Sequence, residues 1–170
     1  MTTVNKPQLA LDVLQQFRVI YGTMRLYFKE VEDRCGFSGS QMWVLQEVSR
    51  SPGLGVTELS LRMGIHQSTC SQMIEKLVTL GCLQKDKQIK DHRRVGLFIA
   101  PDGLKAMAAL PGPAEGVLPH ALSSIPTVAL QTLQINLSEL IKNLPGNDEQ
   151  HENIPLADLI NPNGLDSIAP

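Results

Sequence analysis

The feature that most constrains this fold is a pair of short helical segments joined by a glycine turn and followed at once by two strand-like segments. Thr57 is expected to cap a helix of about two turns, and Gly64 then provides the turn. A second helix is expected over residues 67–80, because its apolar residues recur at helical spacing and Gly81 follows as a stop. That apolar stripe consists of Cys70, Met73, Ile74 and Leu77.

Two short strands, over residues 83–87 and 94–99, are expected directly after the second helix. The intervening residues 88–92 are polar and basic enough for an exposed hairpin. The order of helix, glycine turn, helix and hairpin is that of a winged helix-turn-helix, with the hairpin as the wing. We therefore expect a mainly α fold with a small β-hairpin wing.

Helical periodicity extends to both sides of this unit. On the N-terminal side, a long helix is expected over residues 8–34, and Ser38 and Gln41 have the spacing of a capping box for the next helix. On the C-terminal side, the sequence predicts helices over residues 101–110, 114–122 and 127–144, with a break at Pro111-Gly112-Pro113.

The net charge of −2 conceals an uneven distribution of charge along the chain. Residues 1–144 hold all 15 basic and 12 of the 17 acidic residues, a net charge of +3, whereas the remainder carries five acids. Residues 85–94 hold five basic and two acidic residues. Such a local basic strip is what nucleic-acid binding requires, although an ordinary solvated surface strip can have the same composition.

Other sequence features argue against a membrane protein, a disulfide framework and a metal site. No apolar run approaches the roughly 18 residues of a membrane span, and residues 1–8 lack the profile of a secretory signal, so a cytoplasmic protein is expected. The three cysteines have irregular spacing and form no Cys-x-x-Cys pair. His66 and Cys70 lie one helical turn apart, but two ligands make no zinc site. We predict neither a metal nor a cofactor.

The hairpin and the residues after it resemble the MarR family of winged helix-turn-helix transcription regulators. In that family, Asp-x-Arg is followed at a fixed spacing by Leu-Thr and then by Gly. Residues 91–103 reproduce this spacing without a gap, with Asp91, Arg93 and Gly103 as matches. Ile99 and Ala100 stand in the places of Leu and Thr.

Residues 69–77 and the following glycine resemble the recognition helix of the same family, with Gln72 where arginine is common. The polar face of this helix, opposite the apolar stripe, can approach base edges in DNA. Arg93 resembles the wing arginine that enters the minor groove. Asp91 is expected to position Arg93, because phosphates repel a carboxylate. The residues expected to contact double-stranded DNA are His66, Gln67, Ser68, Ser71, Gln72, Lys76, Lys90, Arg93 and Arg94.

The resemblance implies a homodimeric bacterial regulator that binds specific DNA sequences. We expect one MarR-like domain over residues 1–144, with a winged helix-turn-helix core over 38–103. Residues 8–34 and 103–144 are expected to supply the dimerisation helices. Residues 145–170 are rich in proline, asparagine and acids, and are expected to form a flexible tail.

The resemblance also implies a cleft between the dimerisation and DNA-binding parts that accepts small aromatic acids or phenols. Tyr21 and Trp43 are the candidates for lining this cleft, and Arg25 could supply a positive charge for an anionic effector.

Three alternatives compete with this interpretation. An enzyme is not expected, because the chain has no P-loop, no Gly-x-Ser-x-Gly and no dinucleotide-binding glycine fingerprint. A winged-helix module that binds proteins instead of DNA is opposed by the basic wing. A cysteine-based redox sensor remains a hypothesis, although regulators of this kind have their sensing cysteine early in the first helix and Cys35 lies at the end of that helix.

Overall fold

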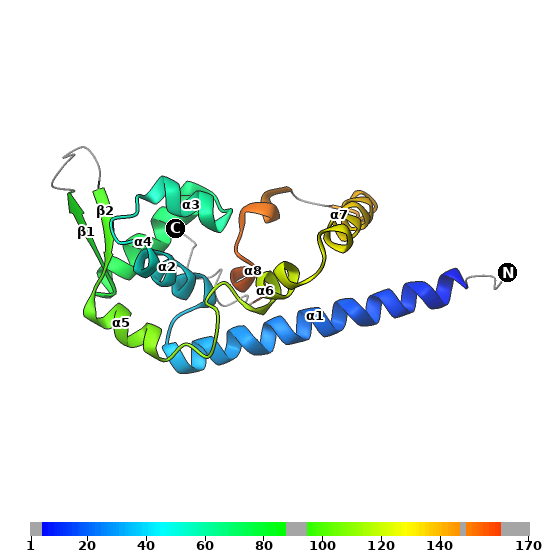
Figure 1. Ribbon diagram of the computed structural model, residues 1–170, viewed down its shortest axis with the longest axis horizontal. Helices are drawn as coiled ribbons and strands as arrows, with labels where there is room; N and C mark the ends of the chain where they lie inside the picture. Colours follow the sequence, from blue (N-terminus) through cyan, green and yellow to red (C-terminus); the bar gives the residue numbers. More distant parts are fainter. Residues whose placement is uncertain (1–4, 88–94, 147–148, 161–170) are drawn as a thin grey trace.

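The computed structural model describes residues 5–87, 95–146 and 149–160 (Figure 1). It confirms a mainly helical fold with a two-stranded antiparallel wing. In chain order, the elements are α1 (Lys6–Cys35), α2 (Gly39–Arg50), α3 (Val56–Met63), α4 (Gln67–Thr79), β1 (Leu83–Lys87), β2 (Val95–Ile99), α5 (Pro101–Ala108), α6 (Val117–Ser124), α7 (Thr127–Lys142), the 3₁₀ helix η1 (Glu149–Asn153) and α8 (Leu156–Ile160).

Helix α1 is packed along only one half of its length. Its buried residues, Met24, Phe28, Val31 and Cys35, recur at helical spacing in the C-terminal half. The described residues up to position 21 are all exposed, and the first turns of α1 extend beyond the rest of the chain (Figure 1). Many apolar side chains of α1 are therefore at the surface and are not covered by other described residues.

Helix α2 begins where the sequence predicts a capping box. The Ser38 hydroxyl accepts a hydrogen bond from the backbone N–H of Gln41, and the Gln41 side chain accepts one from the backbone N–H of Ser38. The apolar side of α2 then lies at the centre of the main hydrophobic core. Its fully buried side chains are Met42, Val44, Leu45 and Val48.

Helices α3 and α4 meet at Gly64, whose φ of 65° is a left-handed conformation that glycine adopts without steric cost. The wing follows α4 directly, with Leu83 opposite Ile99 at the base of the two strands. Leu97 also exchanges backbone hydrogen bonds with the 53–54 loop, which fixes the wing to the end of α2. Helix α5 then begins at Pro101, a residue whose fixed φ suits the first helical position.

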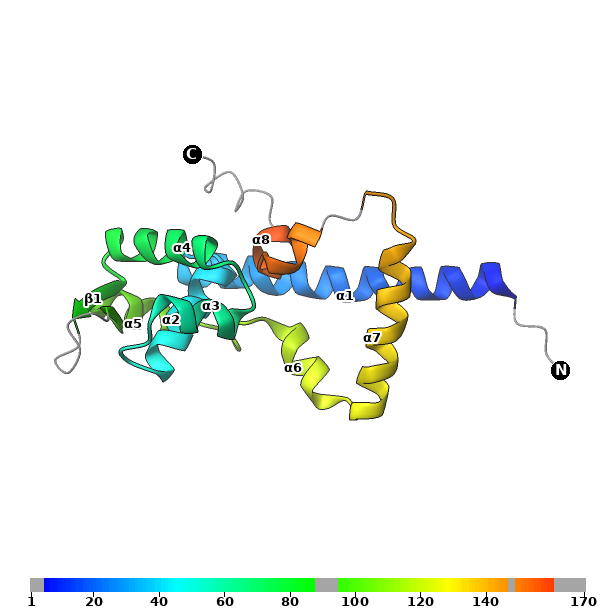
Figure 2. The ribbon, with the colours of Figure 1, turned by 90° about the horizontal axis from the view of Figure 1, so that it is seen from above.

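Helices α6 and α7 lead away from the winged core. Helix α7 crosses over α1 when the two views are compared (Figures 1 and 2). Every residue of α7 except Leu137 is exposed, although the helix is rich in leucine and isoleucine. The described chain therefore leaves α7 without a hydrophobic partner surface.

Part of the tail that composition predicts to be flexible is folded, whereas its residues 147–148 and 161–170 lie outside the described residues. Residues 149–160 form η1 and α8, and α8 packs against both α1 and α2. Ala157 and Ile160 are buried against Met24 and Phe28 in a second, smaller hydrophobic cluster. Apolar residues within an acidic sequence therefore suffice to dock this segment, which the overall composition does not indicate.

Asp158 is buried in this contact, with 4% of its surface exposed. The Ser40 hydroxyl donates to one carboxylate oxygen of Asp158 over 2.6 Å, and its other oxygen, Oδ2, has no hydrogen-bond partner among the described residues. Burial is the largest cause that raises the pKa of Asp158, and Glu32 raises it further. The hydrogen bond from Ser40 and the charge of Lys76 act in the opposite direction.

Smaller differences concern the ends of helices. Helix α3 begins at Val56 with Gly55 as its cap, so the prediction of Thr57 as the capping residue is wrong. Val56 packs against the main core, which explains why the helix starts before the threonine. The predicted helix over 114–122 is displaced to Val117–Ser124, because residues 111–116, a strap before α6, form bends and a turn that side chains of α1 and α2 hold in place.

Candidate nucleic-acid interface

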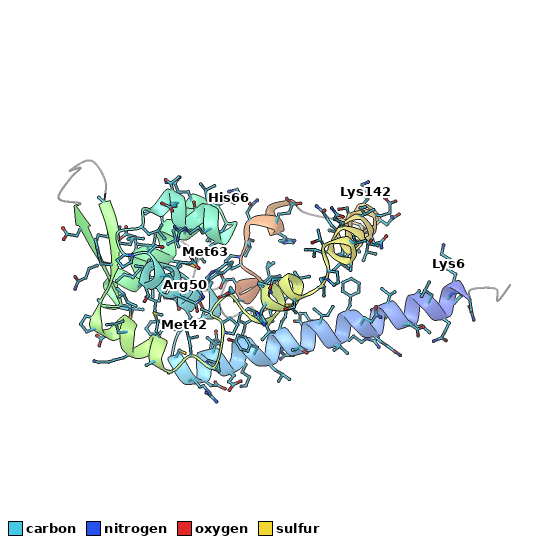
Figure 3. The ribbon with its side chains drawn as sticks, viewed as in Figure 1. Lys6, Met42, Arg50, Met63, His66 and Lys142 are labelled. Atoms are coloured by element: carbon cyan, nitrogen blue, oxygen red, sulfur yellow. The ribbon has the colours of Figure 1, made fainter. Side chains whose placement is uncertain are left out.

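Helix α4 presents two opposite faces. Its apolar stripe of Cys70, Met73, Ile74 and Leu77 is buried in the main core, as its spacing predicts. His66 occupies the cap position before α4, three residues after Met63, which ends α3 (Figure 3). The turn at Gly64 thus sets the first residues of α4 at the surface of the winged core, where a ligand can reach them.

Most of the predicted contact residues on α4 and its cap are accessible to solvent. Five of the six are exposed: His66, Gln67, Ser68, Gln72 and Lys76. Ser71 is half-buried, and its hydroxyl donates to the backbone carbonyl of Gln67 over 2.8 Å. The helix therefore brings together the predicted set, but the Ser71 hydroxyl is already engaged by the helix itself.

An ion pair joins the first wing strand to α4. Lys85 of β1 donates to the carboxylate of Glu75, which lies on the exposed side of α4. This contact was not predicted, because the two residues are ten positions apart and belong to different elements. The predicted wing residues Lys90, Asp91, Arg93 and Arg94 lie outside the described residues.

A second cation group was also missed by sequence reasoning. Arg62 of α3 donates to the Ser51 hydroxyl over 2.8 Å and pairs with Glu58 and Glu47, over 2.6 and 3.6 Å. Arg50, at the end of α2, pairs with Glu47 over 3.1 Å (Figure 3). The spacing of Glu58 and Arg62, one helical turn apart, was the available signal. These pairs reduce the positive potential that the two arginines would otherwise give this surface.

A partly enclosed cavity of about 200 Å³ lies between α2, the turn before α4 and the C-terminal segment. Trp43, predicted to line an effector cleft, is among its lining residues. Tyr21 and Arg25 are not, and both are exposed on α1. The structure thus does not bring the predicted trio together, because Tyr21 lies one turn before the packed part of α1 and Arg25 is offset from the buried stripe of Met24 and Phe28.

The strap before α6 forms another wall of the cavity. Gln46 of α2 donates to the Glu115 carboxylate over 2.7 Å, and its side-chain oxygen accepts from the backbone N–H of Ala114 over 3.1 Å. The Tyr27 hydroxyl donates to the carbonyl of Pro113 over 2.7 Å. Burial, with Glu115 as the next cause, raises the pKa of Tyr27 to about 12. The proline-rich break is therefore a structured strap held to α1 and α2.

The three cysteines are core residues. Cys35, Cys70 and Cys82 are all buried, and burial raises the pKa of the Cys70 thiol to about 11. Burial also raises the pKa values of the other two thiols. Because the thiolate is the reactive form, this environment disfavours rapid oxidation and weakens the redox-sensor alternative.

Two other kinds of site are absent from the part of the chain that the structure describes. No group of three or more histidine, cysteine or acidic side chains in the described ranges is placed to hold a metal ion. None of the helices in those ranges is both long enough and apolar enough to cross a membrane.

Comparison with known proteins agrees with this architecture. Residues 36–94 match the MarR family. A Thauera aromatica protein assigned to transcriptional regulation of the hcr operon is 28% identical over 67 residues, which cover 39% of this chain and 40% of that protein. YusO of Bacillus subtilis has a TM-score of 0.51 and 17% identity, over 82% of this chain and 99% of the other.

MepR of S. aureus, in its complex with DNA, has a TM-score of 0.53 and 15% identity, over 76% of this chain and 94% of the other. At these identities, the two structural likenesses establish the fold. The family match covers the helix-turn-helix and reaches into the wing, the same elements that present the exposed face of α4. Residues 36–94 of this chain are therefore similar to the MarR family, and the fold of the chain is that of a winged helix-turn-helix.

Proposed function

We propose that this chain is a homodimeric transcription regulator that binds specific sequences of double-stranded DNA and responds to a small aromatic effector. The observation that carries the proposal is the exposed polar face of α4, held opposite a buried stripe and next to the wing. MepR, which shares the fold, was crystallised with DNA. Glutamine and serine at the start of such a helix can form hydrogen bonds with base edges in the major groove.

Homodimer formation is supported by two apolar surfaces that the described residues of the chain leave uncovered. In α1, Val19 and Leu26 are 68% and 72% exposed, and in α7, Val128 and Ile135 are 74% and 68% exposed. Contiguous exposed apolar surface of this kind marks an interaction site in a soluble protein. A second copy of the same chain supplies matching surfaces and would set two copies of α4 on one side of the dimer.

The contributions of charge and of base recognition to DNA binding can be measured separately by replacing two residues on the same face of α4. Gln72 and Lys76 are one helical turn apart, and both are exposed. Lys76→Ala should weaken binding to specific and random duplexes alike. Because counterion release follows charge, it should also reduce the slope of log affinity against log salt concentration by about one unit for each phosphate that the protein no longer neutralises. Arg93→Ala should act like Lys76→Ala, with a smaller change in salt dependence if the arginine enters only the minor groove.

Gln72→Ala should instead reduce the preference for the specific site, by roughly 1–3 kcal/mol for each half-site if a bidentate hydrogen bond to a base is removed, and leave the salt dependence unchanged. The operator would first be selected from genomic fragments, and the variants then titrated across a salt series. Lys142→Ala is the matched charge control, because Lys142 lies at the end of α7, far from α4 (Figure 3). If replacing Gln67, Ser71 and Gln72 together leaves operator preference intact, α4 is not the reader.

The effector part of the proposal rests on the cavity beside Trp43. It lies where the C-terminal half of α1 meets α2 and the turn before α4. A molecule bound there would contact both the helix that leads to the exposed dimerisation surface and the turn that orients α4. Differential binding to two orientations of these elements is what a regulatory ligand requires.

A further inference from the structure

The charged residues that line the cavity, among those that the structure describes, all have one sign. Its walls are mostly apolar and include Phe28, Trp43, Met63 and Ile65. The charged residues that line it are Glu115 of the strap and Glu152 of η1, and no lysine, arginine or histidine is among the lining residues that the structure describes. An anionic ligand would lose its hydration there and meet only carboxylates.

A buried acceptor without a donor lies next to the same walls. Ser40 and Ala157 line the cavity. Asp158 follows Ala157 in the chain and accepts a hydrogen bond from Ser40. Its Oδ2 atom is buried and has no partner among the described residues. Burial raises the pKa of this carboxyl, and the opposing charge of Lys76 does not cancel that effect. The cavity and its surroundings therefore have hydrogen-bond acceptors in excess, and no cation is among the described residues that line the cavity.

The C-terminal segment completes the cavity. Glu152, Ile154, Pro155, Leu156 and Ala157 all belong to this segment and form one wall. The opposite wall comes from α2 and the strap, where Gln46 holds Glu115 in place. Without residues 149–160 the site would be an open groove that has lost one of its two lining carboxylates.

We propose that this cavity binds a small apolar cation, an amine attached to a single aromatic or alicyclic ring, and not an aromatic acid. The amine would lie between Glu115 and Glu152, and the ring would pack against Trp43, whose face also attracts cations. A cavity of about 200 Å³ is smaller than typical sites for drug-sized ligands, which favours one ring. The regulatory meaning of this site rests on the function proposed above, whereas its charge preference does not.

Trp43 provides a direct readout, because it is the single tryptophan of the chain and lines the cavity. The full-length chain would be titrated at neutral pH with benzylamine, benzyl alcohol and benzoate, which share one ring and differ in charge. We expect saturable changes in Trp43 fluorescence, with benzylamine binding about tenfold or more tightly than benzoate. Benzyl alcohol should lie between the two.

Two variants test the source of this preference. Glu115→Gln keeps an oxygen that can accept from Gln46, and Glu152→Gln changes an exposed residue, so both should preserve the fold. Each should weaken benzylamine binding severalfold and leave benzyl alcohol unchanged. Glu139→Gln is the matched control, because this exposed acid lies on α7 and does not line the cavity.

Benzoate binding as tightly as benzylamine would overturn the proposed charge preference. Absence of a saturable signal with all three ligands would overturn the site itself. A gel-shift titration of the same preparations keeps the two proposals apart. Loss of DNA binding with the amine preference intact would refute the regulatory function alone, whereas DNA binding without ligand preference would refute this inference alone.

Discussion

The methyl group added by replacing Gly103 with alanine should lower the free energy of unfolding by an amount that can be worked out from its contacts. A Cβ atom at this position would lie 2.3 Å from the backbone oxygen of Cys82 and 3.0 Å from Ile99. The same Cys82 oxygen accepts a hydrogen bond from the backbone N–H of Ala100 over 2.9 Å. Gly103→Ala must therefore move the start of α5 away from the base of the wing, because a backbone atom cannot rotate aside.

The magnitude follows from three contributions. Overpacking costs about 1–3 kcal/mol, and loss of the Ala100 hydrogen bond costs about 1 kcal/mol. The higher helix propensity of alanine returns about 0.5–1 kcal/mol. The net loss in the free energy of unfolding should therefore be about 1–3 kcal/mol, which is large against the total stability of a typical domain.

Urea unfolding followed by circular dichroism would measure this loss, at one fixed protein concentration because dimer formation contributes to stability. Gly22→Ala is the matched control, since Gly22 lies inside α1 and a Cβ there meets no atom within 4 Å. That variant should be more stable by about 0.5–1 kcal/mol. If Gly103→Ala unfolds at the same urea concentration as the parent chain, α5 does not pack on Cys82 as described.

Three further predictions concern the C-terminal half of the chain. Because burial raises the pKa of Asp158 above its ordinary 3.8, docking of α8 should be strongest below that value and weaken as pH rises through the raised pKa. Hydrogen exchange at the Leu159 amide, corrected for intrinsic rates, should show this loss, and Asp158→Asn should abolish the pH dependence. Truncation before Ala129 removes most of α7 and should give monomers or aggregates with weak DNA binding; a soluble dimer in light scattering would place the interface elsewhere. Deletion of residues 148–170 removes five acids and should tighten binding to random duplex at low salt, whereas unchanged affinity there would rule out electrostatic shielding by the tail.

The elements that could be predicted from the sequence are those stabilised by nearby residues. The capping box of Ser38 and Gln41 spans three positions, and the turn at Gly64 depends on the conformation of one residue. The strand over 83–87 was predicted with its observed ends, because a glycine and a polar hairpin bound it on either side. In such places, local chemistry and the final fold favour the same structure.

The cavity could not be predicted, because its walls come from segments far apart in the chain. Trp43 was identified as a lining residue, but Glu115 and the C-terminal segment were not. A short helix in an acidic, proline-containing tail has too few residues to show a clear period. Its docking depends on Phe28 and Ser40, more than a hundred positions earlier, and no local pattern encodes that contact.

The bond between Ser40 and Asp158 also has a consequence for the order in which the chain folds. It joins residues 118 positions apart, whereas Leu83 and Ile99 of the wing are 16 apart. Closing the longer loop costs about 1.8 kcal/mol more in chain entropy, on the logarithmic scaling for flexible loops. The winged core should therefore assemble first and the tail should dock onto it last, so that the tail is also the first part to detach under stress. A protease pulse during refolding would find the C-terminal segment open after the wing has already become protected.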